Sequence, residues 1–245
     1  EVGTLGAQAF AAQWPKDQPL PRSVLVGEPT SLKAVRMHKG HLTLRLTLKG
    51  VSAHSGSPHL GLSAIEPAGR IIQGLSQIQK TLVSELCDSS VYFPEVPHTV
   101  LNVTTIEGGT AINIIPDSCV MHISIRLLPG QTAQPMVQRV DEVVAQEMKQ
   151  GSYDLVVQNE SPPMLLDEHT SIHRELCDLL GQQQSYGVNY ASDGGPFQAG
   201  LGMESVLCGP GTIDVAHKPN ESLPIDEFQK ARPLYEQLIE RMCVS

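Results

Sequence analysis

The sequence predicts an α/β chain in which a ferredoxin-like βαββαβ domain is inserted into a second, discontinuous α/β domain. Three observations support this class. They are a strictly alternating strand at residues 41–49, a β-α-β-β-α-β order of periodicities that ends near residue 160, and separate strand and helix patterns on both sides. We therefore assign residues 41–160 to the inserted domain and residues 1–40 with 161–245 to the outer domain.

The clearest strand is "HLTLRLTLK" at residues 41–49. Its leucines share one face and its polar residues the other, which is typical of a half-buried antiparallel strand. The leucines are Leu42, Leu44, Leu46 and Leu48. A helix follows, because Ser63 and Glu66 form a capping-box pattern and apolar residues keep helical spacing to about Leu82.

The rest of the inserted domain contains two strands, a helix and a final strand. Strand-like runs lie at residues 100–106 and 119–127, with the turn segments "EGGT" and "IIPD" between them. A helix with valines and methionines at helical spacing covers residues 136–148, and the last strand lies near residues 153–157.

The outer domain begins with a glycine turn and a helix in "EVGTLGAQAFAAQW", followed by a short buried strand at residues 24–26 and the loop "GEPTS". We expect a helix over residues 168–183, a loop at "VNYASDGGPFQ" and a second buried strand at "SVLCG". The last helix is expected to be capped by Asp226 and kinked at Pro233.

Composition excludes several classes of protein. The formal net charge of -9 and the absence of a basic run argue against binding to nucleic acid or to a membrane surface. No apolar stretch approaches the ~20 residues of a membrane span. The five cysteines are odd in number and widely spaced, so we expect neither a disulfide framework nor a zinc knuckle and favour a reducing cytoplasm.

Three side chains are candidate metal ligands. Glu28 follows the strand at residues 24–26, His217 lies in the loop "GPGTIDVAHKPNE", and Glu1 precedes a Gly-x-x-Gly turn. Taken singly, Glu28 is most simply a solvated turn carboxylate, His217 a surface histidine and Glu1 an unremarkable terminal residue. Together they lie at the ends of outer-domain elements, where ligands of open α/β sheets bind. Two carboxylates and an imidazole suit Zn²⁺, so the residues indicate part of a metal-dependent hydrolase site.

Seven short motifs, in order along nearly the whole chain, resemble the co-catalytic zinc amidohydrolase and peptidase family of acetylornithine deacetylase, succinyl-diaminopimelate desuccinylase and glutamate carboxypeptidase. The motifs are "EVGTLGA", "VGEPTS", "GVSAHSGSPHLGLSAIE", "GGTAINIIPDSC", "IRLLPG", "SDGGPF" and "GPGTIDVAHKPNESLP". The resemblance implies a zinc-peptidase-like catalytic α/β domain, incomplete in this chain, with an inserted lid domain that also forms the dimer.

The resemblance assigns a role to each candidate residue. Glu1 and His217 match ligands of one metal and Glu28 matches a ligand of the other, in a site of two Zn²⁺ per subunit where Co²⁺ can substitute. His54 matches a lid histidine that reaches a partner subunit's active site and stabilises the oxyanion. The nearby His59 has no such match.

Two lid residues match positions near the substrate. Asn113 and Arg126 are these candidates, and Arg126 is suited to pairing a substrate carboxylate. Without the resemblance, Asn113 is explained as well by a turn-capping amide, and Arg126 by a solvated arginine on a strand.

The chain also departs from the family pattern. The upstream His-x-Asp, the bridging aspartate and the general-base glutamate before Glu1 are absent, and Ala53 stands where one family pattern has glycine. We therefore expect the full gene product to be a cytoplasmic homodimeric enzyme and this segment alone to be inactive. N-acetylornithine is the favoured substrate; N-succinyl-diaminopimelate or another N-acyl amino acid, and a non-catalytic dimerisation module, remain alternatives.

Overall fold

The structure, a computed structural model, describes residues 3–244. The chain divides into two compact units. The outer unit comprises Glu1–Gly40, Val91–Glu95 and Ser161–Ser245, and the inserted unit comprises His41–Ser90 and Val96–Glu160. Helices and strands are mixed throughout, which confirms the predicted α/β class.

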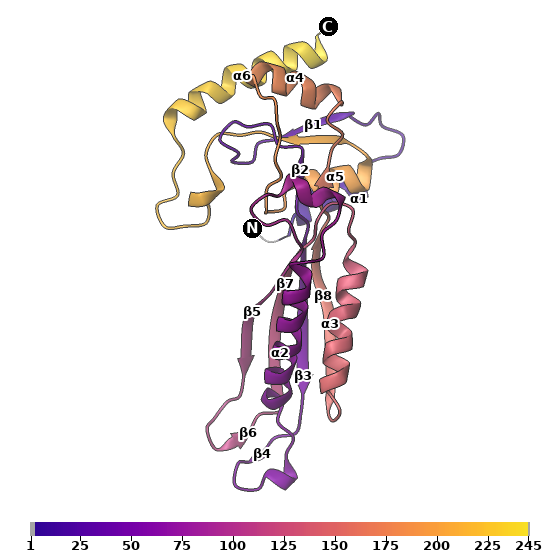
Figure 1. Cartoon of the computed structure of the whole chain (residues 1–245), viewed down its shortest axis with the longest axis vertical. Helices are drawn as coiled ribbons and strands as arrows, with labels where there is room; N and C mark the ends of the chain where they lie inside the picture. Colours follow the sequence, from indigo (N-terminus) through magenta and orange to yellow (C-terminus); the bar gives the residue numbers. More distant parts are fainter. Residues whose placement is uncertain (1–2, 245) are drawn as a thin grey trace. The chain divides into compact units, whose positions relative to one another are not determined.

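The inserted unit is built on a four-stranded sheet in the order β5-β7-β3-β8 (Figure 1). The strands are β3 (His41–Lys49), β5 (Val100–Gly108), β7 (Ser118–Arg126) and β8 (Ser152–Ser161). The central strand β7 pairs antiparallel with both β3 and β5. With the two helices included, the chain order is the predicted βαββαβ.

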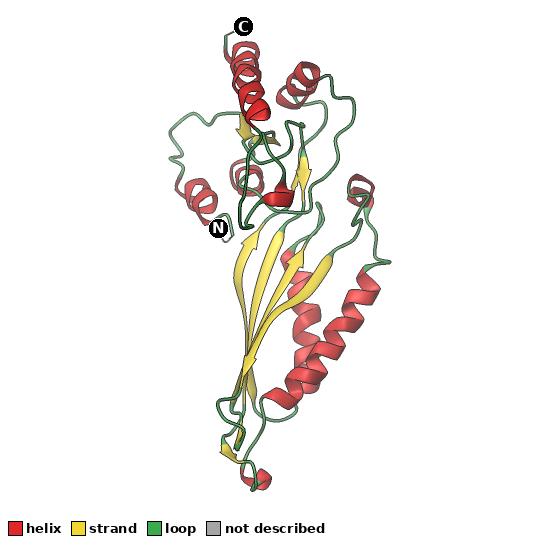
Figure 2. Cartoon of the chain, turned by 90° about the vertical axis from the view of Figure 1, so that its left-hand side faces the viewer, coloured by secondary structure: helices red, strands yellow, loops and turns green. Residues whose placement is uncertain are grey.

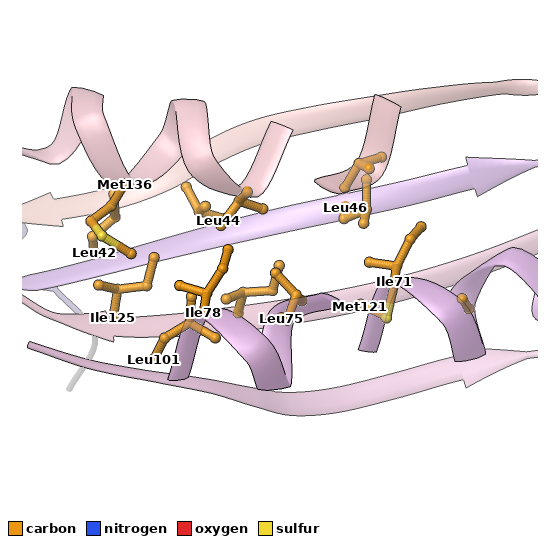
Figure 3. Packing of buried hydrophobic residues seen from close by; sticks show 14 of the residues in the cluster. Leu42, Leu44, Leu46, Ile71, Leu75, Ile78, Leu101, Met121, Ile125 and Met136 are labelled. Carbon is orange, nitrogen blue, oxygen red and sulfur yellow. The ribbon is translucent and has the colours of Figure 1, made fainter. Parts of the chain in front are cut away.

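Two helices, α2 (Ile65–Leu82) and α3 (Ala133–Glu147), cover one face of this sheet (Figure 2). The alternation of β3 explains the layer, because its four leucines are fully buried beneath the helices while its polar residues face the other side. Figure 3 shows Leu44, Leu46, Leu75 and Ile78 in this core.

The sheet ends in a small tip beyond the start of β7. There β4 (Ala53–His54) pairs antiparallel with β6 (Ile114–Ile115), beside the single turn η1 (Pro58–Leu60). A second single turn, η2 (Asp88–Tyr92), follows α2. The tip carries two of the predicted site residues, His54 on β4 and Asn113 just before β6.

The outer unit contains two short sheets and four helices within the described residues. In one sheet β1 (Ser23–Val26) runs parallel to β10 (Glu204–Leu207), and in the other β2 (Met37–His38) is antiparallel to β9 (Met164–Leu165). The remaining elements are α1 (Leu5–Gln13), α4 (Ser171–Leu180), α5 (Gly194–Leu201), η3 (Ile213–Val215) and α6 (Ile225–Cys243). A separate apolar cluster joins β10 to α4 and α6.

Two local predictions for the outer unit were wrong. The segment predicted as a loop contains α5, because Gly194, Gly195 and Pro196 occupy its first turn, where backbone N–H groups need no acceptor within the helix. Asp226 does not cap α6; the helix begins at Ile225 and the Asp226 carboxylate pairs with Lys230 at 3.2 Å.

The predicted capping box is met in part, and the kink predicted at Pro233 stays a prediction. The helix α6 continues past Pro233 to Cys243. Ser63 accepts a hydrogen bond from the Glu66 N–H at 3.4 Å, which is one half of the expected capping box.

No helix within residues 3–244 is long and apolar enough to cross a membrane.

We expect Leu46→Ala to lower the free energy of unfolding of the inserted unit by about 2–5 kcal/mol, because the side chain is fully buried between sheet and helices. Arg45→Ala, the adjacent exposed position, should change it by less than about 0.5 kcal/mol. Urea denaturation followed by circular dichroism measures both. Equal effects of the two substitutions would contradict the assigned face of β3.

Candidate functional site

The first candidate site lies where β1 and β10 end in the outer unit. The two strands are parallel, with Val26 opposite Leu207, so their following loops leave the same edge of the sheet. Backbone hydrogen bonds tie these loops together: the Thr30 and Leu32 N–H groups both donate to the Gly209 carbonyl, at 3.1 and 2.9 Å. The predicted ligand Glu28 therefore stands beside the start of the loop that carries His217.

Gly209 permits this close approach of the two loops. A Cβ atom at this position would lie 2.5 Å from the Glu28 carbonyl oxygen and 2.6 Å from that of Gly27. Such distances are too short for a side chain. Glycine is therefore required at position 209, because any side chain there would clash with the backbone of the candidate ligand Glu28.

Glu28 is partly buried and influences Tyr190. Burial, and after it the Glu28 carboxylate, raises the pKa of the Tyr190 hydroxyl well above its ordinary value. This hydroxyl is buried and has no hydrogen-bond partner among the described residues. Because an unpaired buried hydroxyl costs free energy, a ligand group that paired with the Tyr190 hydroxyl would remove that cost.

The "SDGGPF" motif lies next in the chain and packs closely onto the second sheet. Gly194 N–H donates to the buried Ser192 hydroxyl at 3.2 Å. A Cβ atom on Gly195 would lie 2.2 Å from the Pro162 carbonyl oxygen and 3.1 Å from His38 Cε1. His38 is fully buried, with Nδ1 2.9 Å from the Lys39 carbonyl oxygen. The sequence analysis did not single out His38 or Tyr190 as residues of this region, because neither has a spacing from other polar residues that matches a known motif.

His217 is exposed and follows η3 with a left-handed backbone conformation, φ 60°. Such a conformation is uncommon for a residue other than glycine and needs local support. Its N–H donates to the Glu221 carboxylate at 3.2 Å, and the Gly211 N–H donates to the Glu227 carboxylate at 2.7 Å. The Gly211 bond ties the start of the loop to α6, whereas the His217 bond is local to the loop itself.

The predicted ligand set Glu1, Glu28 and His217 stays a prediction. Glu1 lies outside the described residues. Within residues 3–244 no group of three or more histidine, cysteine, aspartate or glutamate side chains is arranged to hold a metal ion. Glu28 and His217 lie on loops that follow the two adjacent strands, so this part of the chain offers some of the donors that a divalent cation requires.

The tip of the inserted unit brings His54 and Asn113 together. His54 on β4 lies opposite Ile114 on β6, and the Ser55 N–H donates to the Asn113 carbonyl at 2.9 Å. Both side chains are exposed, as is that of His59 on η1.

The ring of His54 has a defined tautomer. The Gly56 N–H donates to Nδ1 at 3.0 Å, so Nδ1 is the acceptor nitrogen and Nε2 of the neutral ring carries the proton. An exposed Nε2–H donor is the group that stabilisation of an oxyanion requires. His59 lacks any such hydrogen bond among the described residues.

Arg126 lies at the opposite end of the same sheet. It ends β7, whereas the tip adjoins Ser118 at the beginning of β7. At about 3.4 Å per residue, the eight steps from Ser118 to Arg126 separate these ends by roughly 27 Å. The structure therefore brings His54 and Asn113 together and places Arg126 well away from both within one chain.

Comparisons with known proteins identify the class. Residues 36–152 match the M20 peptidase dimerisation domain. The fold resembles a tripeptidase from Staphylococcus aureus, with a TM-score of 0.73 and 19% identity over 96% of this chain and 61% of that one. It also resembles the dipeptidase Dug1p from Saccharomyces cerevisiae, with a TM-score of 0.72 and 14% identity over 99% and 64%.

Among curated proteins, the chain is similar to acetylornithine deacetylases. An acetylornithine deacetylase from Edwardsiella ictaluri is 33% identical over 99% of this chain, and one from Proteus mirabilis is 33% identical over all of it. The chain spans 62% of the length of each. The matched domain and these relatives confirm the resemblance seen in the sequence motifs.

We expect Gly209→Ala to destabilise the outer unit by about 1–3 kcal/mol, because the added methyl group overlaps the backbone at Glu28. The matched control is Gly27→Ala in the facing loop, where an added Cβ meets no atom within 4 Å. Thermal unfolding of both variants checks this. A Gly209→Ala protein as stable as Gly27→Ala would show that the two loops are not held this close.

Proposed function

We propose that the protein to which this chain belongs is a zinc-dependent amidohydrolase that removes the acyl group from an N-acyl amino acid, with N-acetylornithine as the favoured substrate and ornithine and acetate as products. It acts as a homodimer through the inserted unit. The relatives that are 33% identical along the whole chain, each an acetylornithine deacetylase, support the reaction class and the favoured substrate.

The metal-binding part of the proposal rests on the loops that follow β1 and β10 in the outer unit. Glu1, Glu28 and His217 would contribute ligands to two Zn²⁺ ions per subunit. The bound zinc would supply an activated water and polarise the scissile carbonyl. The buried, unpaired Tyr190 hydroxyl, whose pKa the Glu28 carboxylate helps to raise, supports a further group in this part of the unit.

The dimer follows from the length of the inserted unit. An N-acyl amino acid is far shorter than the roughly 27 Å between the tip and Arg126, so it cannot contact both ends of one sheet. In a symmetric dimer, one subunit's Arg126 and the partner subunit's His54 can serve the same substrate. The match to a peptidase dimerisation domain supports this arrangement.

Within such a site each residue has a distinct task. The Nε2–H group of His54 donates a hydrogen bond to the oxygen that becomes negative as the amide carbonyl is attacked, an interaction worth about 10²–10³ in rate. Asn113 contributes from the same tip. The guanidinium of Arg126 pairs with the substrate carboxylate and fixes its orientation.

Metal content and activity test the proposal in the full-length protein. We expect about two equivalents of zinc and release of amine from N-acetylornithine; His217→Ala should lose at least one equivalent and reduce kcat/KM by more than about 10³-fold. His59→Ala is the matched control and should change neither quantity. Hydrolysis of none of N-acetylornithine, N-succinyl-diaminopimelate and acetylated neutral amino acids, or zinc content unaltered by His217→Ala, would refute it.

Subunit mixing tests the shared site. His54→Ala and Arg126→Met should each be almost inactive, and mixed subunits should recover about a quarter of wild-type activity, because half of the dimers are mixed and each has one intact site. Native mass spectrometry verifies subunit exchange. If mixed dimers form and remain as inactive as their parents, both residues must act within one chain and the shared site is wrong.

A further inference from the structure

Arg126 has an uncommon environment on the face of the sheet opposite to the helices. The register places His41 on β3 next to the pair Leu42 and Ile125, and hence across from Arg126, while Val100 on β5 lies opposite Arg126 on the other side. His41 and Arg126 are both partly buried. Their neighbours Leu42 and Ile125 point the other way and are fully buried in the core.

No acidic side chain compensates Arg126 from the facing positions. Its two cross-strand neighbours are a histidine and a valine, and within the described residues Arg126 forms no ion pair. Burial lowers the pKa of its guanidinium. Because a partly buried cation without an anion is costly, the site is suited to a carboxylate supplied by a ligand, which a guanidinium binds with two parallel hydrogen bonds.

His41 is held beside Arg126 by two hydroxyl groups. Its Nε2 lies 3.0 Å from Ser124 Oγ and 3.4 Å from Thr43 Oγ1. Burial, and after it the charge of Arg126, lowers the pKa of His41 to about 4, so the ring is neutral near pH 7. If the two hydroxyls donate to Nε2, the proton of the neutral ring lies on Nδ1, which has no partner among the described residues.

We propose that His41 is a positioning and selectivity residue of a carboxylate subsite formed with Arg126 and Ser124 on the open face of the sheet. Arg126 provides the single positive charge, and His41 provides a neutral donor in a fixed orientation. Such a site selects a carboxylate over an uncharged carboxamide. The proposal deepens the proposed function, on which it rests for the identity of the substrate.

Binding without turnover tests this subsite. The full-length protein, stripped of metal with a chelator, is titrated calorimetrically with N-acetylornithine and with its primary carboxamide. We expect the wild type to bind the carboxylate at least about tenfold more tightly than the carboxamide. His41→Phe should lose most of this preference, and so should Arg126→Met.

The double variant distinguishes a shared subsite from two separate effects. Combining His41→Phe with Arg126→Met should weaken carboxylate binding no more than Arg126→Met alone, because His41 acts through the anion that Arg126 holds. His41→Gln retains an amide that can reach Ser124 and should keep part of the preference. The control Thr47→Val, on the same face of β3, should behave as the wild type.

Each outcome decides the role of His41. A carboxylate preference that survives in both folded His41 variants, or equal weakening of carboxylate and carboxamide, overturns the proposal. A carboxylate preference that depends on His41 in a protein that hydrolyses none of the N-acyl amino acids would support the subsite and refute the hydrolase function. Far-UV circular dichroism of each variant verifies folding before titration.

Discussion

The antiparallel pairing of β3 with β7 is the constraint on which the inserted unit depends. Its register aligns two strands that each alternate between buried apolar and outward polar residues, so one face is committed to the helices and the other is left open. A shift by one residue would place Leu44 and Ile123 in solvent and bury Thr43 and Ser124. The same register that buries the core therefore sets His41 across from Arg126.

The length of the paired strands has a second consequence. The proposed site residues of the inserted unit are His54, Asn113 and Arg126. Short strands would keep them near one another, but the nine-residue strand β7 separates Arg126 from the tip that carries the other two. A sheet of this length holds the tip and Arg126 far apart within one chain. It makes a shared site between two copies of the chain a simple way for both ends to meet one small substrate, in agreement with the proposed dimer.

The outer unit uses a different constraint, the parallel pairing of β1 with β10. Parallel strands release their following loops at one edge, and Gly209 lets those loops approach closely enough to share hydrogen bonds. Glu28 thereby lies next to the start of the loop that carries His217, and its carboxylate helps to raise the pKa of the Tyr190 hydroxyl. The proposed metal site depends on this edge, since an isolated carboxylate or imidazole on a loop would bind no metal.

The sequence by itself determined the α/β class, the βαββαβ order and the resemblance to the M20 family, because strand alternation, helical spacing and short motifs are local patterns. It failed at α5 and at Asp226, where a Gly-Gly-Pro first turn and an ion pair with Lys230 replace the expected loop and cap. Only the tertiary structure placed the Glu28 loop against Gly209 and His41 beside Arg126. These proximities depend on strand register and loop packing between distant segments, which no local pattern encodes.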